Sequence, residues 1–312
     1  MHTMGVDLGS TTAKAVIVDG TGAIVAHRVV QMGAVSRRGV TAAIEDVLRE
    51  SGVERGDLGV VIATGYGRRL VPDATRTFTE ITCHARGVAA MSPGTSLVID
   101  IGGQDSKAIR IDSLGLVDDF AMNDRCASGT GRFFDVLARA LECRLEDLDD
   151  LALAGSDDLE VSSMCATFAE TEIISLLAEG SVPADIAASV HRAVAARTLG
   201  LVAQVGRANP VVMTGGVAHS RAAVHFLAKA LGTEVSVPRE PQITGAYGAA
   251  LLGLESLQGE TTVIGHAVER EHRHTGQLAN GHDCTTCSLG QAKYQPIDVE
   301  LWTASVAADR RP

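Results

Sequence analysis

A short run near the N-terminus combines a carboxylate, a glycine turn, hydroxyl groups and a lysine. It reads Asp7-Leu8-Gly9-Ser10-Thr11-Thr12-Ala13-Lys14. Backbone N–H groups at a tight turn, hydroxyl donors and an ammonium group all bind phosphate oxygens, and a strand-end carboxylate suits a hydrated Mg²⁺ ion. The sequence lacks the Walker A pattern GxxxxGK[ST]. The run therefore predicts a phosphate-binding loop that is not a Walker A loop. The residues expected to bind phosphate are Gly9, Ser10, Thr11, Thr12 and Lys14.

The same kinds of residue recur further along the chain, in Asp100-Ile101-Gly102-Gly103-Gln104-Asp105-Ser106-Lys107. We predict that Gly102 and Gly103 form a second phosphate turn. Asp100 is expected to face Mg²⁺ as Asp7 does, directly or through water. For the water that would attack a phosphate, the sequence offers no definite base; Gln104 and Asp105 are the candidates for orienting it.

A third glycine turn, Thr214-Gly215-Gly216-Val217-Ala218, is expected to lead from a strand into a helix. Backbone without side chains lets a flat ring or a ribose lie against Gly215 and Gly216, and the N-terminus of a helix favours an anion. Each turn alone is equally consistent with an ordinary hairpin or strand–helix connection. Their order along the chain indicates one nucleotide site.

Two cysteines lie in similar settings, each shortly before an expected helix. Cys126 stands in NDRCASGTGRF, with Arg125 beside it, and Cys165 in SSMCATFAE. The positive end of a helix dipole favours thiolate, the form that binds metals. A [4Fe–4S] cluster usually needs four thiolates, which a two-fold dimer of this chain would supply. Spacing alone leaves two buried thiols, a Zn²⁺ site and a redox disulfide as alternatives.

Apolar periodicity predicts the elements that position these residues. Strands are expected at residues 3–8, 14–19, 23–30, 60–65, 96–101, 107–111, 115–121, 211–216 and 234–237. Helices are expected at residues 39–51, 80–91, 129–141, 146–153, 167–179 and 183–206, before residue 231, and at 243–256. The alternation predicts an α/β fold.

A strand, a glycine turn and a lysine-bearing strand occur twice, at residues 4–14 and 97–107. This weak repeat predicts two lobes of similar build with a boundary near residue 93, in Ser92-Pro93-Gly94. Lobe I would comprise residues 1–93 and about 240–256. Lobe II would comprise residues 94–239, and residues 257–312 would form a polar C-terminal extension of uncertain order.

Composition narrows the possible partners. The 312 residues are 46% hydrophobic, which is enough to bury a core, and the net charge of −11 argues against binding nucleic acid or an anionic membrane. Six Phe, three Tyr and one Trp are too few to suggest a base-stacking platform. We expect neither a signal peptide nor a transmembrane helix. The expected location is therefore the cytoplasm, where the six cysteines stay reduced.

The three glycine turns resemble the phosphate-1, phosphate-2 and adenosine motifs of the actin/Hsp70/sugar-kinase superfamily, over about residues 4–255. Within it, the two cysteine segments, together with VDLGSTTAK, ATGYGR, EITCHARG, IDIGGQDSK and TGGVA, resemble the activator component of 2-hydroxyacyl-CoA dehydratases. The ATPase subunits of benzoyl-CoA reductase are close relatives. The resemblance implies a two-lobed actin-like ATPase fold of duplicated ribonuclease H-like lobes, with a cluster-bearing helical insert.

The resemblance also implies a mechanism. Each subunit of a homodimer would give two cysteines, here Cys126 and Cys165, to one bridging [4Fe–4S] cluster. The protein would take one electron from ferredoxin or flavodoxin. ATP-linked rearrangement of the helices that follow the two cysteines would then deliver it at low potential to the dehydratase. The acyl-CoA would bind the partner, so this sequence does not identify it.

Other residues fit simpler interpretations. Cys83 and Cys143 are expected to be structural thiols, His84 a helix-surface residue, and Glu170 and Glu172 first-turn residues of a helix. Arg68 and Arg69 are expected to be solvated or to make a contact across the lobes. The tail holds His282, Cys284 and Cys287, for which a metal site, a flexible tail and a partner contact remain open.

Three other functions remain as alternatives: an ATPase subunit of the benzoyl-CoA reductase type, a small-molecule kinase of the sugar-kinase type, and a nucleotide sensor without enzymatic activity. A kinase would need a carboxylate base beside the substrate hydroxyl, for which Asp100 or Asp105 could serve. It would not need Cys126 or Cys165.

Overall fold

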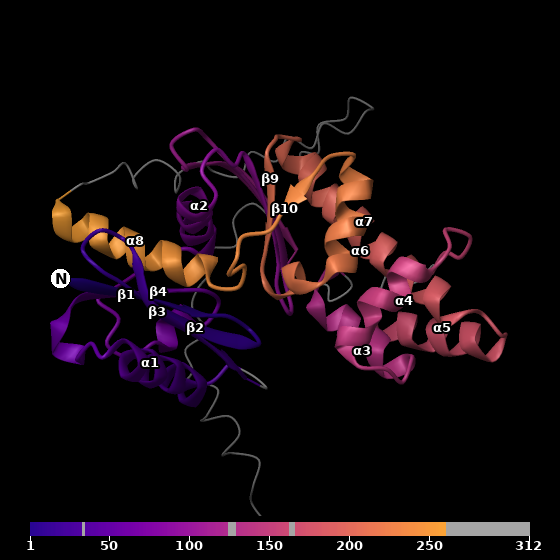
Figure 1. The fold of residues 1–312 in the computed structure, drawn as a ribbon, viewed down its shortest axis with the longest axis horizontal. Coiled ribbons are helices and arrows are strands. Elements are labelled where there is room, and N and C mark those ends of the chain that lie inside the picture. Colours follow the sequence, from indigo (N-terminus) through magenta and orange to yellow (C-terminus); the bar gives the residue numbers. More distant parts are fainter. Residues whose placement is uncertain (33–34, 124–128, 162–165, 260–312) are drawn as a thin grey trace, which may run out of the picture. The chain divides into compact units, whose positions relative to one another are not determined.

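The computed structural model describes residues 1–32, 35–123, 129–161 and 166–259 (Figure 1). All of them belong to the first of two units into which the chain divides, Met1–Ala267.

The N-terminal part forms a five-stranded sheet in the order β3-β2-β1-β4-β5. The strands β1, β2 and β3 form an antiparallel meander, while β1 and β4, and β4 and β5, run parallel. The bounds are β1 His2–Leu8, β2 Thr12–Val18, β3 Ile24–Gln31, β4 Leu58–Thr64 and β5 Arg76–Thr77. Helix α1, Arg37–Ser51, starts at the N-cap Ser36 and packs its apolar residues on one face of this sheet.

A second five-stranded sheet repeats this arrangement in the order β10-β9-β6-β7-β8. Its strands β6, β7 and β8 form the meander, and β9 pairs with β6 in parallel as β4 pairs with β1. The bounds are β6 Leu97–Ile101, β7 Ser106–Ile111, β8 Val117–Asn123, β9 Val211–Thr214 and β10 Val235–Ser236. The internal repeat predicted from the sequence is confirmed at the level of strand order and direction.

Two helices pack on each other between the sheets, α2 (Glu80–Met91) and α8 (Thr244–Gln258) (Figure 1). Helix α8 covers the first sheet and α2 covers the second. Their backbones approach closely, because a Cβ atom added to Gly248 would lie 1.8 Å from the carbonyl oxygen of Cys83. Glycine is required at this crossing, so the contact between the two helices is a backbone contact.

Five helices come after β8 in the chain, four of them before β9 and one between β9 and β10, and they share one large core with the second sheet. They are α3 Gly131–Ala140, α4 Leu148–Ala154, α5 Ala166–Ala178, α6 Pro183–Val205 and α7 Arg221–Leu231. Phe133, Leu137 and Ile186 are fully buried in this core. Each such side chain stabilises the fold by about 1.5–3 kcal/mol relative to an exposed position.

The predicted α/β elements are all present, apart from shifts at their ends. Short pieces without periodicity were missed: the strand β5 and the 3-10 helices η1 (Arg55–Asp57) and η2 (Arg68–Leu70). The helix expected at 146–153 is split between η4, Leu145–Asp147, and α4. Along the described ranges, no helix is long and apolar enough to cross a membrane.

Candidate functional site

The first glycine turn joins β1 to β2. The backbone N–H of Gly9 donates to the carbonyl oxygen of Thr12 at 3.0 Å, which closes the turn. Asp7 and Lys14 are paired across the two antiparallel strands, and Lys14 Nζ lies 3.0 Å from Asp7 Oδ2. The two side chains that flank the turn therefore form an ion pair at its base.

The second turn joins β6 to β7 with the same geometry. The N–H of Gly102 donates to the carbonyl oxygen of Asp105 at 2.9 Å. Asp100 and Lys107 are paired across the strands, as Asp7 and Lys14 are, and Lys107 Nζ lies 3.2 Å from Asp100 Oδ2. Lys107 also donates to Asp105 Oδ2 at 2.7 Å. The predicted correspondence between the two runs thus extends to the cross-strand register.

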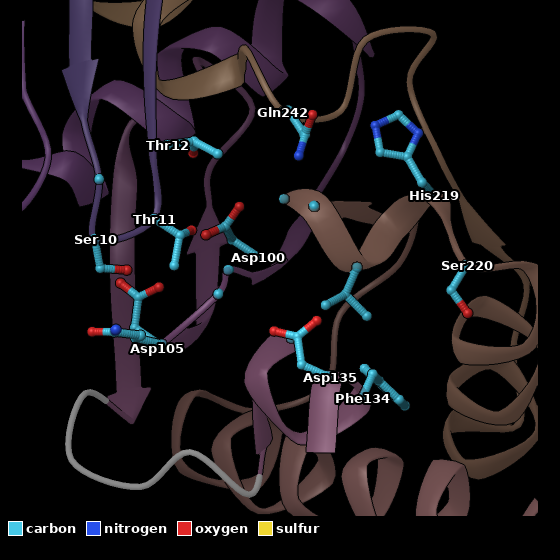
Figure 2. A pocket seen from close by; sticks show the side chains of 18 of the residues that line it. Ser10, Thr11, Thr12, Asp100, Asp105, Phe134, Asp135, His219, Ser220 and Gln242 are labelled. Carbon is cyan, nitrogen blue, oxygen red and sulfur yellow. The ribbon is translucent and has the colours of Figure 1, made fainter. Parts of the chain in front are cut away.

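The two turns meet at one cavity of about 550 Å³ (Figure 2). A Cβ atom added to Gly103 would lie 2.6 Å from Thr11 Oγ1, so the turns are in direct contact. The cavity is lined by every residue predicted to bind phosphate or to face it: Asp7, Gly9, Ser10, Thr11, Thr12, Lys14, Asp100, Gly102, Gly103, Gln104 and Asp105. Gln104 is exposed at this cavity.

The third glycine turn lines the same cavity through Gly215 and Gly216. The strand was expected to run through the two glycines into a helix, and this is wrong in detail. Strand β9 ends at Thr214, and the 3-10 helix η5, Gly216–His219, follows it. Helix α7 starts only at Arg221. Gly215 has φ +87°, which glycine adopts without strain. The positive φ of this residue turns the chain at the end of β9, so the strand does not run directly into α7.

Residues of α3, η4, α4 and η5, together with the N-cap residue of α7, Ser220, line another part of the cavity (Figure 2). Phe134 and Val217 offer apolar surface, and Asp135 lies beside them. Ser220 donates to Asp149 at 2.5 Å. An apolar patch next to carboxylate and hydroxyl groups suits a nucleoside, while the lysines and glycine turns at the other end suit phosphates.

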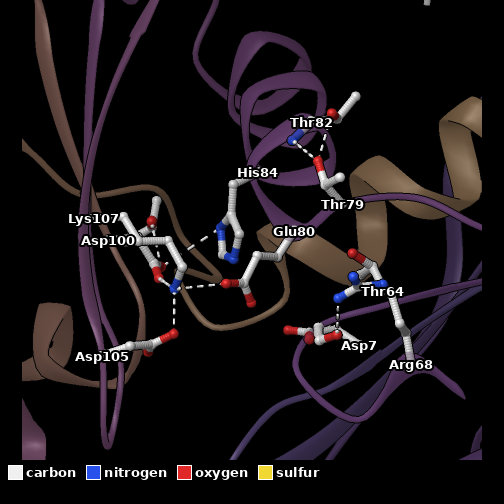
Figure 3. Close-up of polar contacts among 12 residues, drawn as sticks. Asp7, Thr64, Arg68, Thr79, Glu80, Thr82, His84, Asp100, Asp105 and Lys107 are labelled. Carbon is white, nitrogen blue, oxygen red and sulfur yellow. Dashed lines mark hydrogen bonds and ion pairs between the residues drawn. The ribbon is translucent and has the colours of Figure 1, made fainter. Parts of the chain in front are cut away.

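Two cavity residues of α2, Glu80 and His84, were not predicted as site residues. The expectation that His84 lies on a helix surface is wrong, because its side chain is only 8% exposed. Its Nδ1 lies 3.0 Å from Thr244 Oγ1 and 3.6 Å from Asp100 Oδ1 (Figure 3). Glu80 and His84 are four residues apart on one helix, which places their side chains on the same face. This spacing within EITCHARG was the signal available in the sequence.

Opposing effects set the protonation of the buried charges in this cavity. Burial alone would raise the pKa of Asp100, but His84, Lys107 and the hydroxyl of Thr214 outweigh it and hold that pKa well below its usual range. Burial would lower the pKa of Lys107, but Asp100 and its other carboxylate neighbours raise it. The Asp100–Lys107 pair is therefore ionised.

Glu80 behaves differently. Burial raises its pKa, and the attraction of Lys107 opposes this rise only in part. Lys107 Nζ lies 3.9 Å from Glu80 Oε1, which is longer than a hydrogen bond.

Cys126 and Cys165, the predicted cluster ligands, lie outside the described residues, as do Cys284 and Cys287 of the tail. Cys83 is confirmed as a packed thiol: it is fully buried, and burial raises its pKa to about 12. Cys143 is half-buried and lies beyond the end of α3, which stops at Ala140, so the expectation that it ends the helix is wrong. No group of three or more His, Cys, Asp or Glu side chains in the described part of the chain is arranged to hold a metal ion.

Two further expectations can be compared with the structure. Glu170 and Glu172 are not first-turn residues, because α5 begins at Ala166 and has no acidic residue in its first turn. Arg68 donates to the carbonyl oxygen of Gly65 at 3.0 Å and so braces the turn after β4.

Comparison with known proteins gives consistent matches. Residues 4–253 match the model of the BadF/BadG/BcrA/BcrD ATPase family. The activator of lactoyl-CoA dehydratase from Anaerotignum propionicum is 45% identical over 258 residues, covering 83% of this chain and 99% of that protein. One of the benzoyl-CoA reductase subunits from Thauera aromatica is 33% identical, covering 68% of this chain and 77% of that protein.

Two solved structures match the fold. The (R)-2-hydroxyglutaryl-CoA dehydratase component A from Acidaminococcus fermentans has a TM-score of 0.79 at 40% identity, covering 83% of this chain and 99% of that one. The 2-hydroxyisocaproyl-CoA dehydratase activator from Clostridium difficile, solved with bound ADPNP, has a TM-score of 0.78 at 41% identity, covering 83% and 97%. These matches confirm the predicted actin-like ATPase fold.

Proposed function

Because the chain belongs to the BadF/BadG/BcrA/BcrD ATPase family, we propose that it couples ATP hydrolysis to the activation of a 2-hydroxyacyl-CoA dehydratase by delivering single electrons at low potential. The observation that carries this proposal is the cavity in which two equivalent glycine turns and their Asp–Lys pairs face each other. Relatives that activate such dehydratases, including one solved with a bound ATP analogue, support it.

The nucleotide would lie along the cavity with its phosphates between the two turns. Gly9, Ser10, Thr11 and Thr12 offer N–H and hydroxyl donors from one side, and Gly102 and Gly103 offer backbone from the other. The nucleoside would lie against Gly215, Gly216 and Phe134. Lys14 neutralises phosphate charge, as its place at the base of the first turn allows.

Mg²⁺ fits the carboxylates at the base of the two turns. Asp100 already accepts hydrogen bonds on both oxygens, from Thr214 at 2.8 Å and from Lys107 at 3.2 Å. It would therefore face a hydrated ion through water, and Asp7 would do so directly or through water. Mg²⁺ keeps several of its waters and takes few protein ligands, so this donor set suits it. When bound, the ion would neutralise charge that develops on the phosphates.

The electron would be held by a [4Fe–4S] cluster that two subunits of a homodimer share, each through Cys126 and Cys165. Such a cluster supplies one-electron chemistry at low potential. The helices that follow the two cysteines in the chain, α3 and α5, pack against each other in one core. Ferredoxin or flavodoxin would be the electron donor.

The first residues of α3 connect the ATP cavity to this helix pair. The N–H groups of Gly131 and Arg132 donate to the carbonyl oxygens of Gly102 and Gly103 at 2.8 and 3.0 Å. A displacement of the second phosphate turn would therefore be transmitted to α3 through two backbone hydrogen bonds. Through this link, closure of the two glycine turns around the phosphates of ATP would change how far the cluster is exposed to solvent.

A closely related alternative is an ATPase subunit of a benzoyl-CoA-reductase-type enzyme. It would use the same cavity and the same cysteines, but with two different ATPase subunits. This alternative has less support than the dehydratase activator, because the benzoyl-CoA reductase subunit has lower sequence identity and coverage than the dehydratase activators have.

The proposal is tested by electron transfer under exclusion of air. The protein, reduced with reduced flavodoxin or dithionite, is mixed with a purified 2-hydroxyacyl-CoA dehydratase component in the presence of ATP or of ADP, and the return of the visible absorbance that reduction had bleached is followed. We expect rapid reoxidation with ATP and none with ADP. Equal rates with both nucleotides, or ATP hydrolysis without any reoxidation, would contradict the proposal. Cys143→Ser is the matched control and should behave as the wild type does.

A further inference from the structure

Glu80 lines the same cavity as the first and second glycine turns. It is the first residue of α2, held by the N-cap Thr79, whose side chain accepts from the N–H of Thr82 at 3.2 Å. Its carboxylate points toward Lys107 and Asp100 on one side, with Asp7 on the other (Figure 3). The side chain is 20% exposed and lines the cavity. It therefore has access to any ligand held between the two glycine turns.

The carboxylates that surround Glu80 are already engaged. Asp7 binds Lys14 at 3.0 Å, and Asp105 binds Lys107 at 2.7 Å. Asp100 accepts from Thr214 and Lys107. Glu80, by contrast, has only Lys107 at 3.9 Å, and within the described residues its oxygens accept no hydrogen bond. Its acceptor capacity remains available to a water molecule in the cavity.

The electrostatic surroundings of Glu80 suit a base. Burial raises its pKa; Lys107 and His84 counteract this rise, and Asp105 and Asp7 reinforce it. A carboxylate with a raised pKa binds a proton more tightly than an exposed one, which brings it closer to the operating pH of a general base.

We propose that Glu80 is the general base of ATP hydrolysis in this protein and accepts the proton of the attacking water. The inference rests on the ATPase activity and is independent of the cluster. A bond forms between the water oxygen and the γ-phosphorus, and the bond from that phosphorus to the β–γ bridging oxygen breaks. The bridging oxygen leaves with ADP. The proton that passes to Glu80 is then released to the phosphate product or to solvent.

The sequence alone named no base and offered Gln104 and Asp105 only for orienting the water. Asp105 is less suited than Glu80 to accept the proton, because its carboxylate is held by the 2.7 Å bond to Lys107. Gln104 cannot accept it, because an amide has no basic oxygen that could hold a proton at neutral pH. Both residues line the cavity, where they can contact phosphate or solvent.

The test compares Glu80→Gln, Glu80→Asp and Glu80→Ala with the wild type. Glu50→Gln is the matched control, because Glu50 pairs with Arg28 on the surface and is 42% exposed. Steady-state ATP turnover and ATP affinity are measured separately. We expect turnover of Glu80→Gln to fall by about 10²–10⁴-fold, the usual contribution of a general base, with ATP affinity unchanged. Glu80→Asp should retain an intermediate rate, and added formate should restore part of the turnover of Glu80→Ala.

Wild-type turnover in Glu80→Gln would overturn the assignment, and so would a loss of ATP affinity as large as the loss of turnover. Failure of formate to restore Glu80→Ala, in a variant that binds ATP normally, would also count against it. If electron transfer to a dehydratase fails while these ATPase results hold, the proposed function is wrong and the assignment of Glu80 stands.

Discussion

The backbone N–H of Gly131, the first residue of α3, donates a 2.8 Å hydrogen bond to the carbonyl oxygen of Gly102 in the second glycine turn. The residue before it, Thr130, is extended, with φ −135° and ψ 170°. The predicted phosphate turn and the helix that follows the Cys126 segment are thus joined through main-chain atoms. Side-chain changes at the surface of α3 would leave this connection in place.

Removing the donor at this junction should uncouple the two activities. Gly131→Pro lacks the N–H, and proline is tolerated at the first position of a helix when the preceding residue is extended. We expect ATP hydrolysis to persist while ATP-dependent electron delivery falls by more than about tenfold, because a lost hydrogen bond of about 1.4 kcal/mol changes an equilibrium tenfold. Both rates are measured on one preparation, with Gly131→Ala, which keeps the N–H, as the control. Unchanged coupling in the proline variant would refute this link.

Lys107 should be a major determinant of stability. Its side chain is 2% exposed and neutralises the equally buried Asp100. Lys107→Met leaves that carboxylate without its cation, which should cost about 3–5 kcal/mol in the free energy of unfolding. Urea unfolding measures this loss. Lys229→Met removes an exposed pair with Asp157 and should change stability by at most about 1 kcal/mol; similar losses in both variants would contradict the prediction.

The same pair predicts how stability depends on pH. The pKa of Asp100 is lowered in the folded protein from an ordinary value of 3.8. The stabilisation from ionised Asp100 is therefore fully present above that value and is lost as the pH falls below it. Lys107→Met should flatten this acid-side decline in unfolding experiments. A decline as steep as that of the wild type would show that the pair does not cause it.

The crossing of α2 and α8 should not tolerate a side chain. In Gly248→Ala the new methyl group would lie 1.8 Å from the carbonyl oxygen of Cys83, so the helices must separate. Gly200, in α6, has nothing within 4 Å of such a group. We expect Gly248→Ala to lower the melting temperature and Gly200→Ala to stabilise by about 0.5–1 kcal/mol through helix propensity. Equal effects of the two substitutions would disprove the close contact.

Asp7→Asn tests the proposed metal side of the cavity. The amide keeps the shape but loses the negative charge that pairs with Lys14 and that we propose faces Mg²⁺. We expect ATP turnover at a fixed Mg²⁺ concentration to fall by at least about tenfold, with partial recovery at higher Mg²⁺. Asp46→Asn, which loses only a surface pair with Arg49, is the control. Normal turnover and an unchanged Mg²⁺ requirement would exclude this role for Asp7.

Much of this site could be predicted because its chemistry is local in sequence. Asp7 and Lys14, and Asp100 and Lys107, are joined by short turns, so strand register alone brings each pair together. Glu80 and His84 could not be found in this way. Their spacing places them on one face of α2, but that face meets the cavity only because α2 packs on α8 and on the second sheet, a tertiary arrangement that the spacing does not encode.

The third turn shows a different limit. The pattern at Gly215 and Gly216 predicts a nucleoside lying against bare backbone. The structure shows a further reason for glycine, because a Cβ atom on Gly215 would lie 2.3 Å from the carbonyl oxygen of Ile101. The pattern did not predict where the helix begins, because Gly215 has a positive φ at a tertiary contact with the neighbouring strand. The hydrophobic pattern does not encode such a turn.

The claim that this ATPase carries electrons is tested most directly by its iron content after purification without air. We expect a brown protein with about four irons per dimer, as one shared cluster of four thiolates requires. Cys126→Ser and Cys165→Ser should each lose the iron and the visible absorbance, while Cys143→Ser keeps both. A colourless, iron-free wild type, or an unchanged iron content in Cys126→Ser, would contradict the account.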